Sequence, residues 1–73
     1  MAYRIDREGP TPDRNEVGPW VSTLSAALRN LARIARMYTD GGWRVEWHES
    51  DREFTATMAH GHVKVTYRIV SQI

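Results

Sequence analysis

Residues 19–39 read PWVSTLSAALRNLARIARMYT, and this stretch decides the fold of the chain. At about 100° per residue its apolar side chains fall inside one arc of roughly 120°, the width of a helix face that packs on a core. These side chains are Trp20, Leu24, Ala27, Leu28, Leu31, Ile34, Ala35 and Tyr38. Pro19 suits a first helical turn, after Gly18 as its cap, and the Gly41-Gly42 pair suits a helix end. The sequence therefore predicts one amphipathic helix over residues 19–39.

The opposite side of this helix carries a row of arginines. Arg29, Arg33 and Arg36 fall within about 60° of one another, and residues 19–39 contain no acidic residue. Guanidinium groups bind carboxylate and phosphate through two parallel hydrogen bonds. The row is therefore a candidate partner-binding surface, although arginine is also a good helix former that keeps an exposed face hydrated.

After the helix the apolar period changes from 3.6 to 2, which is typical of strands. The segments WRVEWH, REFTATM and HVKVTYRI alternate apolar and polar residues, and turn residues separate them. Two-residue turns at Ser50-Asp51 and His60-Gly61 would set one register. That register places Trp47 opposite Phe54, Val45 opposite Ala56, Phe54 opposite Tyr67, Ala56 opposite Val65 and, on the other face, Glu53 opposite Arg68. All the apolar residues share one face, so we expect a three-stranded antiparallel meander over residues 43–70.

The apolar face of the meander and the apolar stripe of the helix can bury each other. We therefore expect a two-layer α+β fold, one long amphipathic helix on a three-stranded antiparallel meander, in a single domain of residues 1–73. Residues 2–6, AYRID, are compatible with a short additional strand, which gives the order (β)αβββ. The rest of the arm, residues 1–18, has two prolines and two glycines without a period and is expected to be a loop.

Composition excludes several classes of protein. The 73 residues include no cysteine, so disulfides, thiolate zinc sites and thiol nucleophiles are excluded. A net charge of +1 argues against nucleic-acid binding by bulk charge. There is no apolar run of membrane-spanning length, and the segment MAYRIDREG has no apolar signal-peptide core. We expect no membrane association and a cytoplasmic location, in a bacterium or an infected host cell.

No catalytic or metal constellation emerges. His48 and the pair His60 and His62 lie at opposite ends of the middle strand, roughly 20 Å apart at about 3.4 Å per residue, so they cannot share a metal ion. The row of His48, Glu53 and Arg68 has acid–base residue types but lies on a flat, hydrated sheet face. The Gly41-Gly42 pair follows a helix, whereas a phosphate-binding loop follows a strand. We expect neither an enzyme nor a cofactor.

Two further surfaces are candidates for binding. Glu46, Glu49, Asp51 and Glu53 gather around one turn, where they either contact a basic partner or form a hydrated hairpin tip. The last strand, which ends in Val70, Ser71, Gln72 and Ile73, is expected to be an open sheet edge. Such an edge permits dimers or the addition of a partner's strand.

These features lead to three hypotheses. The first is a non-enzymatic interaction protein that docks on a larger protein partner, such as a nucleic-acid-handling complex, and modulates or blocks it. In size, segregated charge and lack of catalytic groups the chain resembles, in general character only, phage and mobile-element inhibitors of host machinery, including anti-CRISPR proteins. The second is a nucleic-acid-binding module that uses the arginine row. The third is a structural homo-oligomer formed through the last strand or the N-terminal arm, so we expect a monomer or a weak homodimer.

Overall fold

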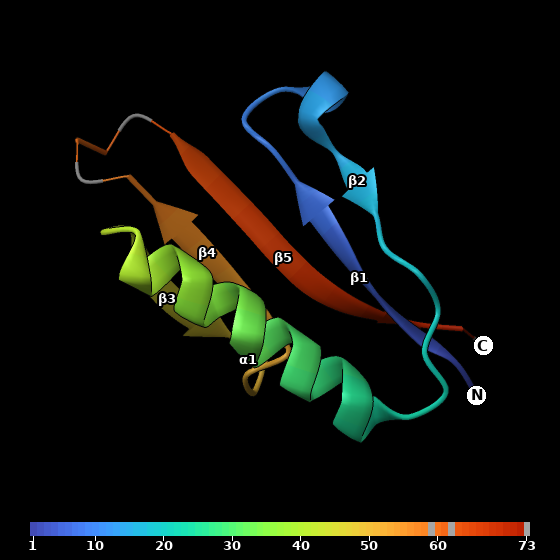
Figure 1. Cartoon of the computed structure of the whole chain (residues 1–73). Helices are drawn as coiled ribbons and strands as arrows, with labels where there is room; N and C mark the ends of the chain where they lie inside the picture. The colour runs from blue at the N-terminus through green and yellow to red at the C-terminus, as the bar shows by residue number, and fades with distance from the viewer. Residues whose placement is uncertain (59, 62, 73) are drawn as a thin grey trace.

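The chain folds into two layers, with one helix packed on one face of an antiparallel sheet (Figure 1). The computed structural model describes residues 1–58, 60–61 and 63–72, and in these residues the sheet has five strands. The elements along the chain are β1 (Tyr3–Glu8), the 3₁₀ turn η1 (Pro12–Arg14), β2 (Glu16–Val17), α1 (Leu24–Asp40), β3 (Arg44–His48), β4 (Glu53–Thr57) and β5 (Lys64–Ser71). The predicted α+β class and the βαβββ order are confirmed. Among the described residues, no helix has the length and apolar character that crossing a membrane requires.

The strand order is β2-β1-β5-β4-β3, which corrects the predicted position of the last strand. β5 is not an open edge, because β1 pairs with it from Tyr3↔Ser71 to Glu8↔Thr66. β1 is also longer than residues 2–6, and the predicted loop contains η1 and β2, which pairs with β1. The prediction of a loop was therefore wrong for these residues. The physical reason is that β5 extends beyond β4 and has unpaired backbone groups on its other side, which the backbone of β1 pairs with.

The predicted register of the meander is confirmed at every pair. Trp47 lies opposite Phe54, Ala56 lies opposite Val65, and the remaining pairs follow in step. The first turn spans four residues and is closed by the Arg52 amide, which donates to the Glu49 carbonyl at 3.1 Å. The second turn includes His60 and Gly61, where Gly61 has φ 74°, and its neighbours Ala59 and His62 lie outside the described residues.

The helix begins at Leu24, so the prediction of a start at Pro19 was wrong. Residues 18–21 instead run along the edge of β1, where the Gly18 amide donates to the Ile5 carbonyl at 2.9 Å. These backbone hydrogen bonds to β1 hold the segment extended, so the helix does not start at Pro19. Trp20 leaves the predicted stripe, and Arg4 lies over its ring at 4.7 Å from the centroid.

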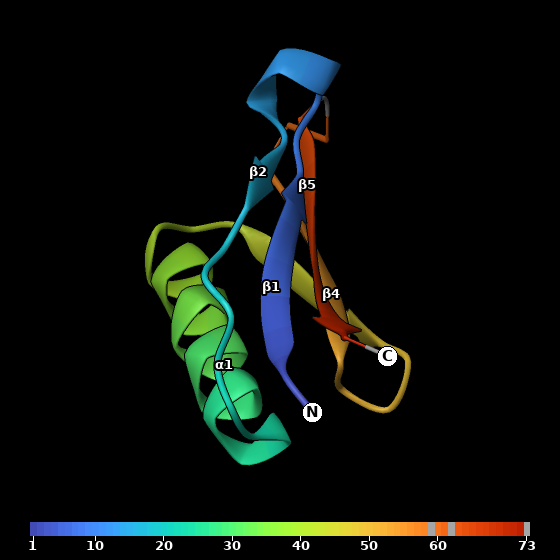
Figure 2. The ribbon, with the colours of Figure 1, turned by 90° about the vertical axis from the view of Figure 1, so that its right-hand side faces the viewer.

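The core lies between the middle of α1 and β4. Leu31 and Ala35 from the helix and Phe54 and Ala56 from the sheet form one buried cluster. Phe54 stacks on the Tyr67 ring at 5.2 Å between centroids, and Tyr38 closes the aromatic group from the helix. Figure 2 shows that α1 covers one face of the sheet only, which leaves the other face to solvent.

The first testable prediction concerns the corrected start of α1. The Thr23 hydroxyl accepts a hydrogen bond from the Ala26 amide at 3.1 Å, so Thr23 is the N-cap. Thr23→Ala removes this acceptor and should lower the free energy of unfolding by about 1 kcal/mol, whereas Thr23→Ser, which keeps the hydroxyl, should change it by a few tenths only. Urea denaturation followed by circular dichroism measures both. An unchanged stability in Thr23→Ala would argue that the helix starts elsewhere.

Candidate interaction surfaces

The predicted arginine row lies on the side of α1 that faces away from the sheet. Arg29, Arg33 and Arg36 are all exposed. Within the described residues none of them forms a salt bridge, and Asp40, one turn after Arg36, does not pair with it either. The only side-chain hydrogen bond that they form within the described residues runs from Arg33 to the Asn30 carboxamide oxygen at 3.3 Å. We call Arg29, Arg33 and Arg36 the arginine face.

The arginines of β1 differ from those of α1, because each forms a salt bridge with a carboxylate. Arg4 pairs with Asp6 at 2.8 Å, and Arg7 pairs with Glu16 at 3.4 Å. A guanidinium that is already paired has less to gain from a partner's carboxylate. The unpaired guanidinium groups of α1 are therefore better placed to bind a partner.

The four acidic candidates do not form one free patch. Glu53 accepts a hydrogen bond from Arg68 at 3.1 Å, and its side chain is only 23% exposed. Glu46 points from β3 to the open face of the sheet, as its pairing with Thr55 requires. Glu49 and Asp51 lie in the turn itself, where both have positive φ. The acidic surface that remains is thus narrower than the sequence indicates.

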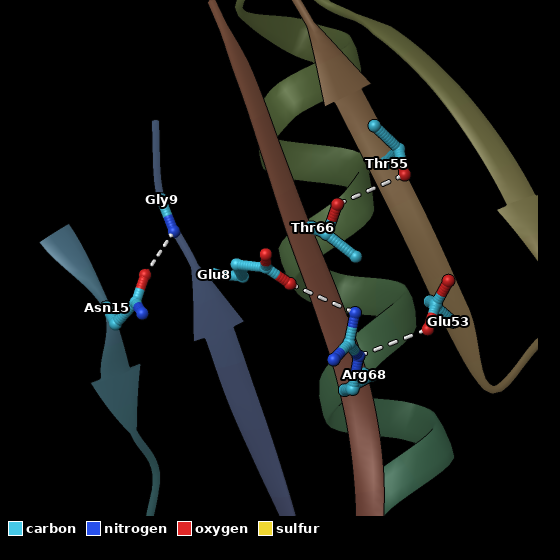
Figure 3. A network of polar contacts seen from close by, with 7 residues as sticks. All are labelled: Glu8, Gly9, Asn15, Glu53, Thr55, Thr66 and Arg68. Carbon is cyan, nitrogen blue, oxygen red and sulfur yellow. Dashed lines mark hydrogen bonds and ion pairs between the residues drawn. The ribbon is translucent and has the colours of Figure 1, made fainter. Parts of the chain in front are cut away.

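The open face of the sheet carries a polar network that is shown in Figure 3. Arg68 lies between two carboxylates, because it also binds Glu8 at 3.1 Å. The Thr55 and Thr66 hydroxyls share a hydrogen bond at 3.3 Å beside it. The sequence predicted the Glu53–Arg68 pair but missed Glu8, since nothing in the pattern indicates that β1 lies beside β5. This network links three strands, and Glu8 and Arg68 also line a cavity of about 300 Å³ that extends towards β2.

A groove that the sequence did not predict runs between α1 and the β1–β2 edge. Its cavity has a volume of about 340 Å³. Aliphatic side chains, among them Ile5, Val21 and Ile34, line part of it, and Arg33 lies at its helix side. The charged side chains of Arg4, Arg7 and Glu16 line the part next to β1 and β2. The groove thus places an apolar surface directly beside the arginine face.

Tyr67 borders this groove and has an altered acidity. Burial, and then its hydrogen bond with the Tyr38 hydroxyl at 3.1 Å, raise the pKa of Tyr67 well above its ordinary value of 10.0. The charge of Glu16 acts in the same direction and that of Arg7 opposes it. The phenol is therefore neutral near pH 7 and serves packing and hydrogen bonding rather than acid–base chemistry.

The two histidines that the structure describes lie in different parts of the fold. His48 ends β3, His60 lies in the turn after β4, and His62 is outside the described residues. In the part of the chain that the structure describes, no group of three or more histidine or acidic side chains is arranged to hold a metal ion. The predicted row of His48, Glu53 and Arg68 lies across three neighbouring strands, as the register requires.

Comparison with protein-family models, with curated proteins and with solved structures finds no match to this chain. Any functional conclusion therefore depends on the surfaces described above.

The raised pKa of Tyr67 predicts a loss of stability in base. Between pH 10.0 and the higher pKa of the folded state, the unfolded chain has released the Tyr67 proton and the folded chain has not, so the free energy of unfolding falls as the pH rises. The slope from this proton is at most about 1.4 kcal/mol per pH unit, and it is smaller where water reaches the ring.

Tyr67→Phe should remove this part of the pH dependence, and urea titrations at pH values from neutral to strongly basic measure it. Tyr3→Phe is the matched control and should keep the slope. Equal slopes in wild type and Tyr67→Phe would contradict the assignment.

Proposed function

We propose that this protein is a non-enzymatic interaction protein that docks its arginine face on an acidic surface of a larger protein and modulates or blocks that partner. The observation that carries the proposal is that three arginines without a salt bridge among the described residues share one side of α1. Arg4, Arg7 and Arg68 are neutralised within the sheet, whereas the arginine face has no salt bridge within the described residues.

The geometry of the arginine face suits a docking surface. From Arg29 to Arg36 the helix rises about 10 Å at 1.5 Å per residue, so the guanidinium groups can engage several carboxylates along a partner element. Arginine is enriched among the residues that dominate binding energy at protein interfaces. A helix of fixed geometry also loses little conformational freedom when it binds.

The groove beside Arg33 favours a protein over a nucleic acid as the partner. Its walls include Ile5, Val21 and Ile34, which can receive an aliphatic side chain. Interfaces between proteins combine an apolar pocket of this kind with charged groups at its rim. Phosphate backbones offer no apolar group of that shape.

The proposed mode of action is steric. A domain of 73 residues can act on a larger protein complex by occupying a surface that the complex needs. Phage and mobile-element inhibitors, among them anti-CRISPR proteins, share this general character, which supports a bacterial or infected-cell cytoplasm as the setting and a nucleic-acid-handling complex as the partner.

The double charge reversal Arg29→Glu with Arg33→Glu tests the proposal. We expect it to lower the affinity for the partner by about 100-fold or more, because repulsion replaces two interface contacts. Affinity capture from bacterial lysate with mass spectrometry identifies the partner, and isothermal titration calorimetry with the purified partner measures the change.

The matched control is Arg14→Glu with Arg52→Glu, which makes the same change in net charge at two exposed arginines outside α1. This control should bind like wild type. If the reversal on α1 binds equally well while both variants keep the wild-type thermal unfolding, the arginine face is not the interface.

A nucleic-acid-binding module is the second candidate. It is favoured by the separation of charge across the layers, because Glu46 and Glu53 lie on the open sheet face and not beside the arginines of α1. A phosphate backbone could therefore approach the helix without meeting these acids.

This alternative predicts binding to duplex DNA that weakens steeply with salt. Three phosphate contacts give a slope of log K against log salt of about −2.7, and Arg33→Ala should reduce its magnitude by about 0.9. Fluorescence anisotropy across a salt series measures both slopes. Absence of binding at low salt would exclude direct recognition of DNA by the arginine face.

A further inference from the structure

The two edges of the sheet differ in how well they are protected from pairing with another strand. The β2 edge is short and irregular: Asp6 lies opposite Val17 but Tyr3 lies opposite Val21, so the intervening segment contains one extra residue and a proline. Bulges and prolines of this kind prevent further pairing at a sheet edge. The β3 edge spans Arg44–His48 without glycine or proline, and no strand among the described residues pairs with its outer side.

Hydrogen bonds at the two ends of β4 fix which β3 groups face outward. The Ile69 amide donates to the Arg52 carbonyl at 2.9 Å, and the Met58 amide donates to the Val63 carbonyl at 3.0 Å. Even-numbered residues of β4 therefore bond β5, and the odd-numbered ones bond β3, because backbone groups alternate in direction along an antiparallel strand.

The same alternation shows which backbone groups of β3 point towards β4 and which point towards the free edge. Arg44, Glu46 and His48 lie opposite the odd-numbered residues of β4, so their backbone groups face inward. Those of Val45 and Trp47 face the free edge. The Trp43 amide donates to the Tyr38 carbonyl at 3.0 Å, which leaves its carbonyl available.

The side chains of β3 match this exposed backbone. Val45 is half-buried and Trp47 is 40% exposed, both on the face that α1 covers. On the other face Arg44 and Glu46 are exposed, and neither forms a salt bridge to any side chain that the structure describes. The edge thus has an apolar side and a side with two unpaired, opposite charges.

We propose that β3 pairs antiparallel with β3 of a second copy of this chain, about a two-fold axis at Val45. In this register Val45 exchanges both backbone hydrogen bonds with Val45 of the second copy, and the Trp47 amide donates to the Trp43 carbonyl. Arg44 lies opposite Glu46 of the second copy, and the two-fold repeats this ion pair. Because Arg44 and Glu46 form a non-hydrogen-bonded pair, their side chains come close together.

Neighbouring registers fail on physical grounds. A two-fold at Glu46 would pair the outward backbone groups of Val45 and Trp47, but it would place the two Glu46 carboxylates directly opposite one another. A two-fold at Trp47 would pair residues from the first turn, where Glu49 has φ 53° and leaves the extended conformation. Pairing about Val45 is the register that satisfies both the backbone groups and the charges.

The dimer would be one continuous sheet with both copies of α1 on the same face. This follows because the two-fold axis is perpendicular to the sheet and does not exchange its faces. Both arginine faces would then point to the same side. The inference depends on β3 alone and does not require the proposed function.

Sedimentation equilibrium of the whole chain tests the pairing. Wild type should approach twice the chain mass of 8.4 kDa as its concentration rises to about 1 mM, which reveals a dimer with a Kd of about 1 mM or tighter. Glu46→Arg and Arg44→Glu each place like charges opposite one another, so each variant alone should dimerise at least about tenfold more weakly.

Mixing the two variants gives the sharpest result. An Arg44→Glu chain and a Glu46→Arg chain restore opposite charges at both cross-strand positions, so the mixture should form a heterodimer at least as tightly as wild type. Glu49→Arg carries the same charge change just beyond the paired stretch; it should dimerise like wild type, and its mixture with Arg44→Glu should be weaker than the first mixture.

A wild-type chain that stays monomeric at about 1 mM would overturn the proposal. So would a dimer that neither single variant weakens, provided circular dichroism shows the variants to be folded. If the two mixtures associate equally tightly, the effect comes from net charge alone. That result would also overturn the register.

Discussion

Packing of Leu31 and Ala35 on Phe54 and Ala56 is the contact on which the rest of the structure depends. A chain of 73 residues without cysteine has only apolar burial to stabilise it. These four residues form its fully or nearly fully enclosed cluster, and the half-buried aromatic side chains pack around them. Because the cluster covers one face of both α1 and the sheet, it also determines which side chains remain in water. The arginine face and the open sheet face are consequences of this packing.

Local patterns predicted the part of the fold that local geometry controls. A tight turn and a pleat of period 2 leave one register that gathers the apolar residues on a single face, and the observed pairs follow it from Val45↔Ala56 to Phe54↔Tyr67. The helix stripe was predicted for the same reason, apart from Trp20. Contacts between distant segments were not predictable, because no periodicity in residues 3–8 indicates which strand they will join.

The same distinction applies to the candidate surfaces. The positions of Arg29, Arg33 and Arg36 follow from helical spacing alone, so the sequence was sufficient to place them on one side. Which charges stay unpaired depends on strand order: Glu8 meets Arg68 across β1 and β5, far apart in sequence. The exposed sheet edge also depends on strand order: β1 joins β5 and not β3, so β3 stays an outer strand whereas β5 does not.

The central position of β5 has a consequence for synthesis. β5 is made after the other strands, yet it lies between β1 and β4 and joins them into one sheet. Until the ribosome has released Ser71, the N-terminal strand and the β3–β4 hairpin have no common partner, so the nascent chain cannot complete its sheet. Pairing between segments so distant in sequence is also slow, because the chain loses much entropy when its ends come together. The sheet should therefore be completed only after β5 is available, and not strand by strand in the order of synthesis.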